Sequence, residues 1–159
     1  MTARVLDACC GGRMMWFDKK NPDALFVDVR SFARREIWRN EAGDSRSFGV
    51  APDLQADFRT LPLDDESFSL VVFDPPHLAR RNGKTGWMQT KYGSLSETWR
   101  DDLRAGFAEC FRVLKAGGTL VFKWSEAEIS IGDVAALAPK APLFGQRTAR
   151  LTHWLVFIK

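Results

Sequence analysis

The sequence predicts an α/β fold: one domain with a mostly parallel central sheet and helices on both faces. Short apolar runs recur along the chain and are separated by longer polar or helical segments, which is the pattern of alternating strands and helices. The length of 159 residues suits one domain with a core that needs no disulfides. Hydrophobic residues make up 45% and charged residues 27%, as in ordinary globular proteins. We therefore expect one domain over residues 1–159.

Five apolar runs of four to seven residues are the predicted strands. They lie at 4–8, 24–29, 69–73, 119–124 and 154–158, and the last is expected to close the fold. The clearest helix is predicted over 95–115, where Ser96 can cap its start and Gly117 and Gly118 can stop it. A shorter helix is expected over about 131–138.

Two segments, 40–53 and 79–94, fit no regular element. Long irregular loops in a compact domain are usually functional or disordered. The second segment directly follows the sequence Asp-Pro-Pro-His at 74–77, so we expect a function there.

The composition argues against several classes of protein. The three cysteines, two adjacent and one distant, give neither a disulfide framework nor a spaced metal motif, and His77 and His153 lack paired ligands nearby. No run approaches the roughly 20 apolar residues of a membrane span. The first predicted strand begins almost at Met1, so no leader is expected. We expect a reduced, metal-free, cytoplasmic protein without membrane contact.

Acidic residues lie before or at the ends of the first three predicted strands. The first strand runs into an acid and a turn of small residues, which lets a ligand approach the backbone closely: Asp7, Ala8, Cys9, Cys10, Gly11 and Gly12. Asp28 ends the second strand, where an acid can accept hydrogen bonds from both ribose hydroxyls of a nucleotide. Asp57 and Phe58 precede the third predicted strand. This order indicates a nucleotide-sized site at one edge of the sheet.

The most informative stretch follows the strand 69–73 and reads Asp74-Pro75-Pro76-His77. An acid and two rigid prolines at the carboxyl end of a strand provide fixed acceptors, a carboxylate and backbone carbonyls, at the mouth of a crevice.

These sites, in this order, resemble those of class I S-adenosylmethionine-dependent methyltransferases over about residues 4–124. The resemblance implies a Rossmann-like methyltransferase fold and S-adenosyl-L-methionine as cofactor. The residues that it assigns to the cofactor are Asp7, Ala8, Cys9, Cys10, Gly11, Asp28, Asp57, Phe58 and Asp74. The chain departs from the usual Gly-x-Gly by a cysteine at the first small position. A dehydrogenase would instead require Gly-x-Gly-x-x-Gly, which the residues after Gly12 do not match.

The resemblance also implies the chemistry of residues 74–77. An exocyclic amine of adenine or cytosine is a poor nucleophile because its lone pair is delocalised into the ring. The Asp74 carboxylate and the Pro75 carbonyl can hold both N–H groups and turn the lone pair towards the sulfonium methyl. Pro76 fixes the backbone, and His77 occupies the position of the usual base-stacking aromatic. Methylation at cytosine carbon 5 would need a thiolate, and no cysteine lies in this region.

Basic and aromatic residues alternate after this motif. Residues 79–100 hold five basic residues against one acid, with three aromatic side chains among them. Charge for phosphates and rings for bases predict a nucleic-acid groove. The residues assigned to it are Arg80, Arg81, Lys84, Trp87, Lys91 and Tyr92. Arg34, Arg35, Arg39 and Trp38 are expected to extend it.

The predicted function is therefore methyl transfer to an exocyclic nucleobase nitrogen, with adenine N6 in DNA favoured over RNA. The chain resembles compact phage- or prophage-type adenine methyltransferases in having no separate target-recognition domain. That absence suggests a homodimer. A methyltransferase acting on RNA, protein glutamine or a small molecule remains open, as does a non-catalytic subunit. Trp16 and Phe17 either cover the cofactor or pack in the core.

Overall fold

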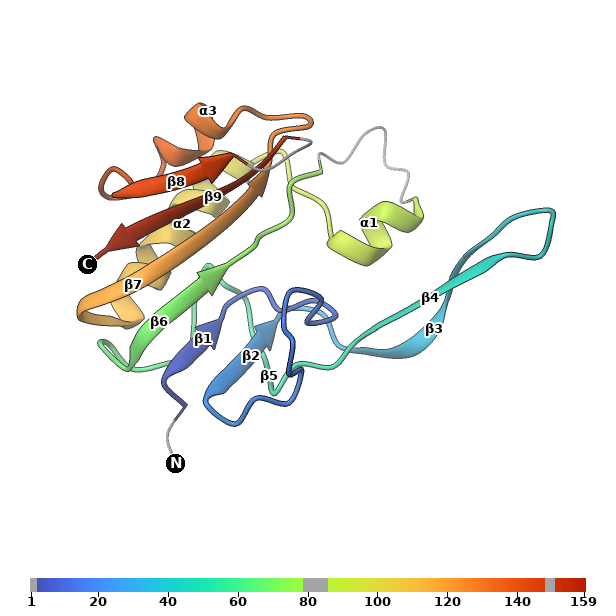
Figure 1. The fold of residues 1–159 in the computed structure, drawn as a ribbon, viewed down its shortest axis with the longest axis horizontal. Coiled ribbons are helices and arrows are strands. Elements are labelled where there is room, and N and C mark those ends of the chain that lie inside the picture. The colour runs from blue at the N-terminus through green and yellow to red at the C-terminus, as the bar shows by residue number, and fades with distance from the viewer. Residues whose placement is uncertain (1–2, 79–85, 148–150) are drawn as a thin grey trace.

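Seven strands of the computed structural model, which describes residues 3–78, 86–147 and 151–159, form the main sheet in the order β5-β2-β1-β6-β7-β9-β8 (Figure 1). The strands are β1 (Val5–Asp7), β2 (Ala24–Asp28), β5 (Leu54–Gln55), β6 (Phe68–Phe73), β7 (Leu114–Ser125), β8 (Phe144–Arg147) and β9 (Thr152–Ile158). Pairing is parallel from β5 to β7, whereas β9 runs antiparallel to both of its neighbours. The predicted α/β class with a mostly parallel sheet is confirmed.

The connections change direction between β1 and β6. From β1 the chain builds outwards through β2 and β5 on one side, and β6 leads to β7 on the other. The carboxyl ends of β1 and β6 therefore flank a topological switch point, where open α/β sheets bind ligands. The predicted acidic sites follow these strands and lie at this edge.

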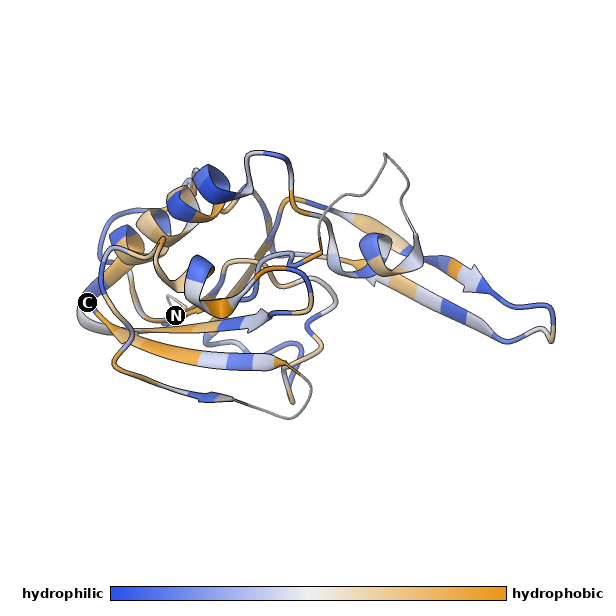
Figure 2. Cartoon of the chain, turned by 90° about the horizontal axis from the view of Figure 1, so that it is seen from above, coloured by the Kyte–Doolittle hydropathy of each residue, from blue (hydrophilic) through white to orange (hydrophobic). Residues whose placement is uncertain are grey.

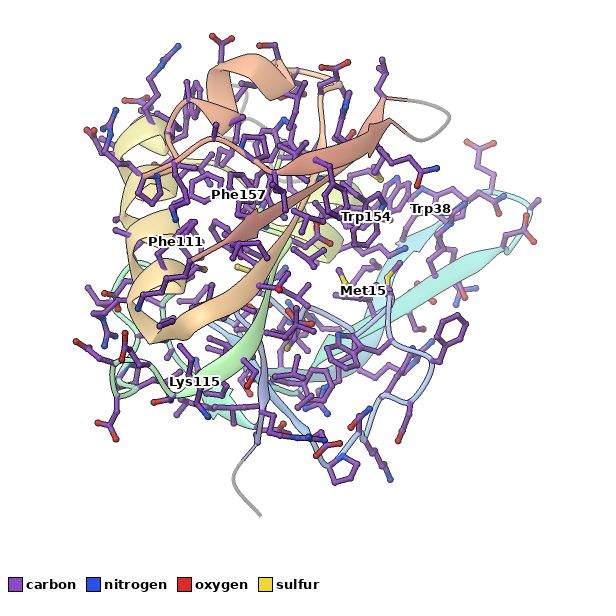
Figure 3. All side chains as sticks on the ribbon, turned by 60° about the vertical axis from the view of Figure 1, so that its left-hand side comes forward. Met15, Trp38, Phe111, Lys115, Trp154 and Phe157 are labelled. Carbon is purple, nitrogen blue, oxygen red and sulfur yellow. The ribbon has the colours of Figure 1, made fainter. Side chains whose placement is uncertain are left out.

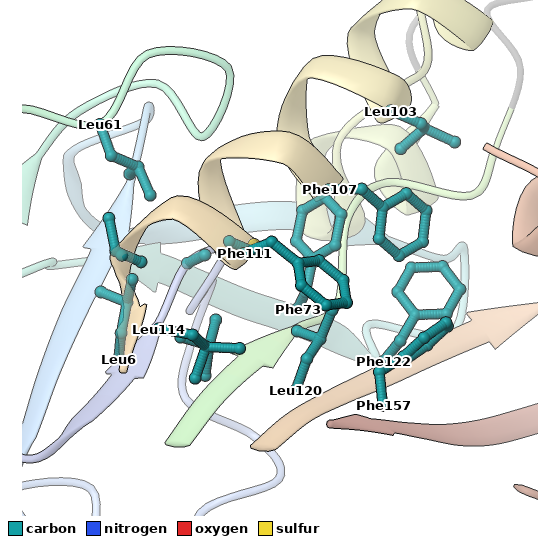
Figure 4. Close-up of a cluster of buried hydrophobic side chains, with 14 of the residues drawn as sticks. Leu6, Leu61, Phe73, Leu103, Phe107, Phe111, Leu114, Leu120, Phe122 and Phe157 are labelled. Carbon is teal, nitrogen blue, oxygen red and sulfur yellow. The ribbon is translucent and has the colours of Figure 1, made fainter. Parts of the chain in front are cut away.

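The main core lies between the sheet and α2 (Trp99–Val113), with α3 (Ile131–Ala135) on the same side. Phe107 of α2 packs against Phe122 of β7 and Phe157 of β9, with ring centroids 4.8 and 6.0 Å apart (Figure 4). Phe111 contacts Phe157 from the next turn of α2, since residues four apart share a helix face (Figure 3).

The opposite face of β1 and β2 is covered by an irregular segment, residues 8–23, which forms turns. Ala24 and Phe26 belong to this second face because side chains alternate along a strand. The Trp16 ring meets Phe26 edge-on at 4.8 Å, and the Arg13 guanidinium lies 3.8 Å from the Phe26 ring centroid. Arg13 also donates to Asp53 at 2.7 Å, which fixes the segment.

A two-stranded arm projects from the domain and has no counterpart in the predicted elements (Figures 1 and 2). It consists of β3 (Phe32–Arg39) and β4 (Ser45–Val50), paired antiparallel. The prediction that 40–53 is irregular was wrong for β4. The first half of β4, Ser45 to Ser47, is polar and exposed, so apolar alternation does not identify the strand, and its partner strand supplies the hydrogen bonds.

Several predicted boundaries shift. The helix predicted over 95–115 begins at Trp99 after Thr98 and ends at Val113, so Gly117 and Gly118 lie within β7. The segment 79–94 contains α1 (Trp87–Tyr92). The last predicted strand does not close the sheet, because β8 pairs outside it. In the described part of the chain, no helix is long and apolar enough to cross a membrane.

Candidate active site

A cavity with about 790 Å³ of unfilled space opens to solvent at the carboxyl ends of the central strands. It brings together residues that are far apart in the sequence. The sequence-predicted residues that line it are Cys9, Cys10, Gly11, Asp28, Phe58, Asp74, Pro75, Pro76, His77, Lys91 and Tyr92. Asp7, Ala8, Asp57 and Trp87 are described but do not line it. Arg80, Arg81 and Lys84 lie outside the described residues.

The turn after β1 brings its backbone close to the cavity. Gly11 has φ +50°, which favours glycine, and its N–H donates to Asp28 Oδ2 at 2.9 Å. A Cβ on Gly12 would lie 2.6 Å from the Phe48 ring, so a side chain there would displace Phe48. Gly11 is therefore favoured by its backbone conformation, and Gly12 by its close packing against Phe48.

Asp28 has a second, unexpected partner. The Arg30 side chain donates to both carboxylate oxygens, at 3.0 and 3.2 Å, and the Arg30 backbone N–H donates at 2.9 Å. With Gly11, these contacts use all of the roughly four lone-pair positions of a carboxylate. The remaining Arg30 nitrogen donates to the carbonyls of Thr90 and Lys91, so Arg30 joins Asp28 to the end of α1.

Asp7 lies behind the cavity wall, not on its surface. It is fully buried and accepts from Trp16 Nε1 at 2.7 Å and from the Cys9 N–H at 3.3 Å. Burial raises its pKa to about 7, against the two hydrogen bonds, which lower it. Asp7 thus stabilises the glycine turn through its hydrogen bond with the Cys9 N–H. Ala8 is buried beside it.

Trp16 and Phe17 do not line the cavity. Trp16 packs on Phe26, as the core alternative predicts, whereas the Phe17 side chain is fully exposed. Met14 and Met15 of the same segment line the cavity instead. Their position could not be derived from the sequence, because the segment has no helical or strand periodicity to fix its direction.

The two residues at the third acidic position, Asp57 and Phe58, have different environments. Phe58 lines the cavity and meets Phe73 edge-on, with ring centroids 5.3 Å apart. Asp57 is held by Arg59, whose Nη2 donates to Oδ2 at 2.6 Å, and this contact lowers the pKa of the Asp57 carboxyl. The aromatic ring, not the carboxylate, is the part of this pair that faces the cavity.

Asp74 forms an ion pair with Lys123, which lies near the carboxyl end of β7. Lys123 Nζ donates to Asp74 Oδ2 at 2.7 Å, and Lys123 also lines the cavity. The Asp74 side chain is 22% exposed. Burial raises the pKa of Asp74, and Lys123 and His77 oppose that rise. The lysine therefore favours the charged, hydrogen-bond-accepting form of the carboxylate.

His77 belongs to an aromatic wall of the cavity. Its ring lies 5.9 Å from that of Tyr92 in α1 and 6.2 Å from that of Trp124 in β7, between centroids. Burial lowers the pKa of His77 below its ordinary value, so the imidazole is neutral at pH 7. A neutral ring among aromatic side chains suits stacking.

The cysteines are poor nucleophiles in this setting. Burial raises the pKa of the Cys10 thiol to about 12 and moves those of Cys9 and Cys110 upward. All three thiols are therefore protonated at neutral pH, and a protonated thiol does not attack carbon 6 of cytosine. Among the described residues, no three His, Cys, Asp or Glu side chains are grouped to hold a metal ion.

Comparisons with known proteins extend the fold assignment. No protein-family model matches the chain. Over 122 residues, 76% of this chain, it is 27% identical to a malonyl-[acyl-carrier protein] O-methyltransferase of Enterobacter lignolyticus (strain SCF1). The chain spans only 38% of that relative's length.

Among solved structures, the PH0226 protein of Pyrococcus horikoshii OT3 superposes with a TM-score of 0.60 at 15% identity, over 99% of this chain and 82% of that one. The antibiotic-resistance methyltransferase Kmr reaches a TM-score of 0.43 at 16% identity, over 98% and 87% of the two chains. With its strand order and single antiparallel insertion, the chain has the Rossmann-like fold of methyltransferases.

Proposed function

We propose that the protein transfers a methyl group from S-adenosyl-L-methionine to an exocyclic amino nitrogen of a nucleobase, adenine N6 in DNA. One observation carries the proposal. A partly exposed carboxylate, Asp74, and an aromatic wall that includes His77 face the same cavity as Asp28 and the glycine turn. An amine acceptor, a stacking surface and a nucleotide-binding edge thus meet in one place.

The residues present fit the cofactor. Asp28 lines the cavity and is the proposed acceptor for ribose hydroxyls, which would replace contacts from the Arg30 side chain. The backbone of Gly11, with no Cβ, lines the same cavity. Phe58 provides an apolar surface for the adenine ring, while Asp7 holds the turn from behind. When bound, S-adenosyl-L-methionine supplies an electrophilic methyl group on a sulfonium.

The target amine is proposed to bind at Asp74. Lys123 takes Oδ2 and leaves Oδ1 without a hydrogen bond among the described residues. Oδ1 accepts one N–H of the amine, the Pro75 carbonyl accepts the other, and the two rigid prolines hold both acceptors in place. The neutral His77 ring stacks on the base, beside Tyr92.

The proposed partner is nucleic acid. Lys91 and Tyr92 line the cavity mouth and Trp87 lies in the same short helix. Arg80, Arg81 and Lys84 stay sequence-based predictions for phosphate contact. The homodimer also stays a prediction, which sedimentation at micromolar concentration tests.

A second candidate is methyl transfer to a small or protein-borne acid. It is favoured by the similarity to an O-methyltransferase and by the cations Arg30, Lys91 and Lys123 around the cavity, which suit an anionic substrate. Two of these cations are already engaged: Arg30 by Asp28 and Lys123 by Asp74. Binding of a nucleobase amine at the target site requires neither the Arg30–Asp28 nor the Lys123–Asp74 ion pair to break.

The decisive experiment follows tritium from labelled cofactor into single-stranded DNA, duplex DNA, RNA, acyl-carrier protein and cell extract, with nucleoside mass spectrometry of the product. N6-methyladenine in DNA is expected. Asp74→Ala should abolish transfer and leave affinity for S-adenosylhomocysteine within a few fold. Asp101→Ala, an exposed acid on α2, is the matched control. Calorimetry that shows no binding of S-adenosylhomocysteine would overturn the cofactor assignment.

A further inference from the structure

A shallow groove lies beside the cavity, between the arm and α1. The arm contributes side chains from both of its strands, and Lys91 contributes from α1. Lys91 and Phe48 line the groove and the cavity alike, so the two hollows are neighbours. A chain-like ligand in the groove would therefore lie next to the cavity that Asp74 lines.

The groove carries positive charge without acids. Its cations are Arg34, Arg46 and Lys91, and no carboxylate of the described residues lines it. Arg34 and Arg46 are exposed, and none of the three cations forms an ion pair within the described part of the chain. Ser45 and Ser47 add hydroxyl groups. Unpaired guanidinium groups with neighbouring hydroxyls are the usual contacts for phosphate oxygens.

Arg46 is positioned by two tryptophans. Its guanidinium lies 4.6 Å from the ring centroid of Trp87 in α1 and 5.5 Å from that of Trp38 in β3. Cation–π contacts on both sides limit the freedom of a long side chain, so less entropy is lost when it binds an anion. Arg46 also links the arm to α1.

The tip of the arm has the opposite charge. Residues 40–44 include Glu41 and Asp44 and no basic residue, and Asn40 is bonded to Asp44. A two-stranded ribbon can enter the major groove of duplex DNA, but an acidic tip would meet phosphates there. Arg34, Arg46 and Lys91 instead line the groove between the arm and α1, which suits one flexible strand.

We propose that the groove between the arm and α1 binds the sugar-phosphate backbone of single-stranded DNA next to the base held at Asp74. This inference rests on the proposed function. It adds Arg34 and Arg46 as phosphate ligands from the arm, and it predicts that the protein acts on unpaired or opened DNA.

The test compares two double variants with the same change in charge. Arg34→Gln with Arg46→Gln removes the groove cations. Lys19→Gln with Lys20→Gln removes two exposed cations that line neither the groove nor the cavity. Binding of a fluorescent 12-nucleotide single strand is measured by anisotropy over a salt series. Each lost phosphate contact should reduce the slope of log affinity against log salt by about 0.7.

In the groove variant, the magnitude of the slope should therefore fall by about 1.4. If affinity at 1 M salt is unchanged, affinity at about 0.1 M salt should be roughly 25-fold lower than in the wild type. The control variant should keep the wild-type slope. Both should bind S-adenosylhomocysteine as the wild type does. If the double variant does not fold, Arg34→Gln alone serves, with an expected loss of about 0.7. Equal slopes for the two variants would overturn the proposal.

Further measurements distinguish this inference from the proposed function. An RNA strand or a DNA duplex that binds more tightly than single-stranded DNA would overturn the chosen partner. Arm-dependent binding of single-stranded DNA without any methyl transfer to it would support the groove and reject the proposed function. Methyl transfer to DNA with unchanged KM and salt slope in the groove variant would support that function and reject the groove.

Discussion

The Lys123 ammonium and the Asp74 carboxylate are joined by a 2.7 Å hydrogen bond across two neighbouring parallel strands, β7 and β6. Register explains the contact: Phe73 lies opposite Phe122, so Asp74 and Lys123, the residues that follow them, are neighbours. The pair places a compensating charge at the proposed amine acceptor. Lys123 is therefore a positioning residue for the proposed reaction, because it acts through Asp74.

Lys123→Met should move the acid limb of the pH–rate profile to higher pH. Lys123 lowers the pKa of Asp74 against the effect of burial, so its loss raises that pKa further and more alkaline solution is needed to ionise the acceptor. At pH 7, kcat/KM should fall tenfold or more, as expected for a charge-assisted hydrogen bond of about 1.5–3 kcal/mol. Lys123→Arg should return the acid limb of the profile to its wild-type position. An unshifted profile in Lys123→Met would show that the pair is only structural.

His77→Phe should retain or raise turnover. The pKa of His77 is lowered by burial, so the imidazole is neutral and acts as a ring. Phenylalanine keeps the ring, whereas His77→Ala should lose stacking worth roughly 1–3 kcal/mol, about 5- to 150-fold in kcat/KM. Steady-state kinetics of both variants check this. Inactivity of His77→Phe with normal folding would instead assign a hydrogen-bonding or proton-transfer role to the imidazole.

Arg30→Ala should increase affinity for S-adenosylhomocysteine. Arg30 occupies both oxygens of Asp28, so ribose hydroxyls compete with it for the carboxylate. A partly exposed ion pair is worth about 0.2–1 kcal/mol, which predicts a 1.4- to 5-fold gain by calorimetry. Weaker binding would mean that Arg30 contacts the cofactor directly. Asp28→Ala, in contrast, should lose affinity.

Asp7→Asn should remove a pH dependence of folding stability. The pKa of Asp7 is raised from 3.8 to about 7, so the folded state keeps a proton that the unfolded state releases. Stability from this group is fully present below pH 3.8 and is lost as pH rises to about 7, by roughly 4 kcal/mol at most. Urea unfolding at pH 5 and pH 8 should show a smaller loss in Asp7→Asn than in the wild type. An equal loss in both proteins would place the titration elsewhere.

The sequence by itself determined five of the seven strands of the main sheet, the long helix and the row of sites at the carboxyl ends of the strands. These features depend on local chemistry: apolar runs for β2 and β6, helical periodicity in α2, glycines at a tight turn and prolines after Asp74. Because parallel strands end at one edge, the order of the sites along the chain already implied a common cavity.

Only the tertiary structure decided which side chains meet. Arg30 and Thr90 are 60 residues apart, Asp74 and Lys123 are 49 apart, and β9 inserts between β7 and β8. The arm has too little apolar alternation to be predicted, since its strands stabilise each other through backbone hydrogen bonds. Asp7 and Asp57 resemble cofactor ligands in sequence, but packing turns one towards Trp16 and an ion pair holds the other at Arg59. Such contacts depend on register and packing, which local patterns do not encode.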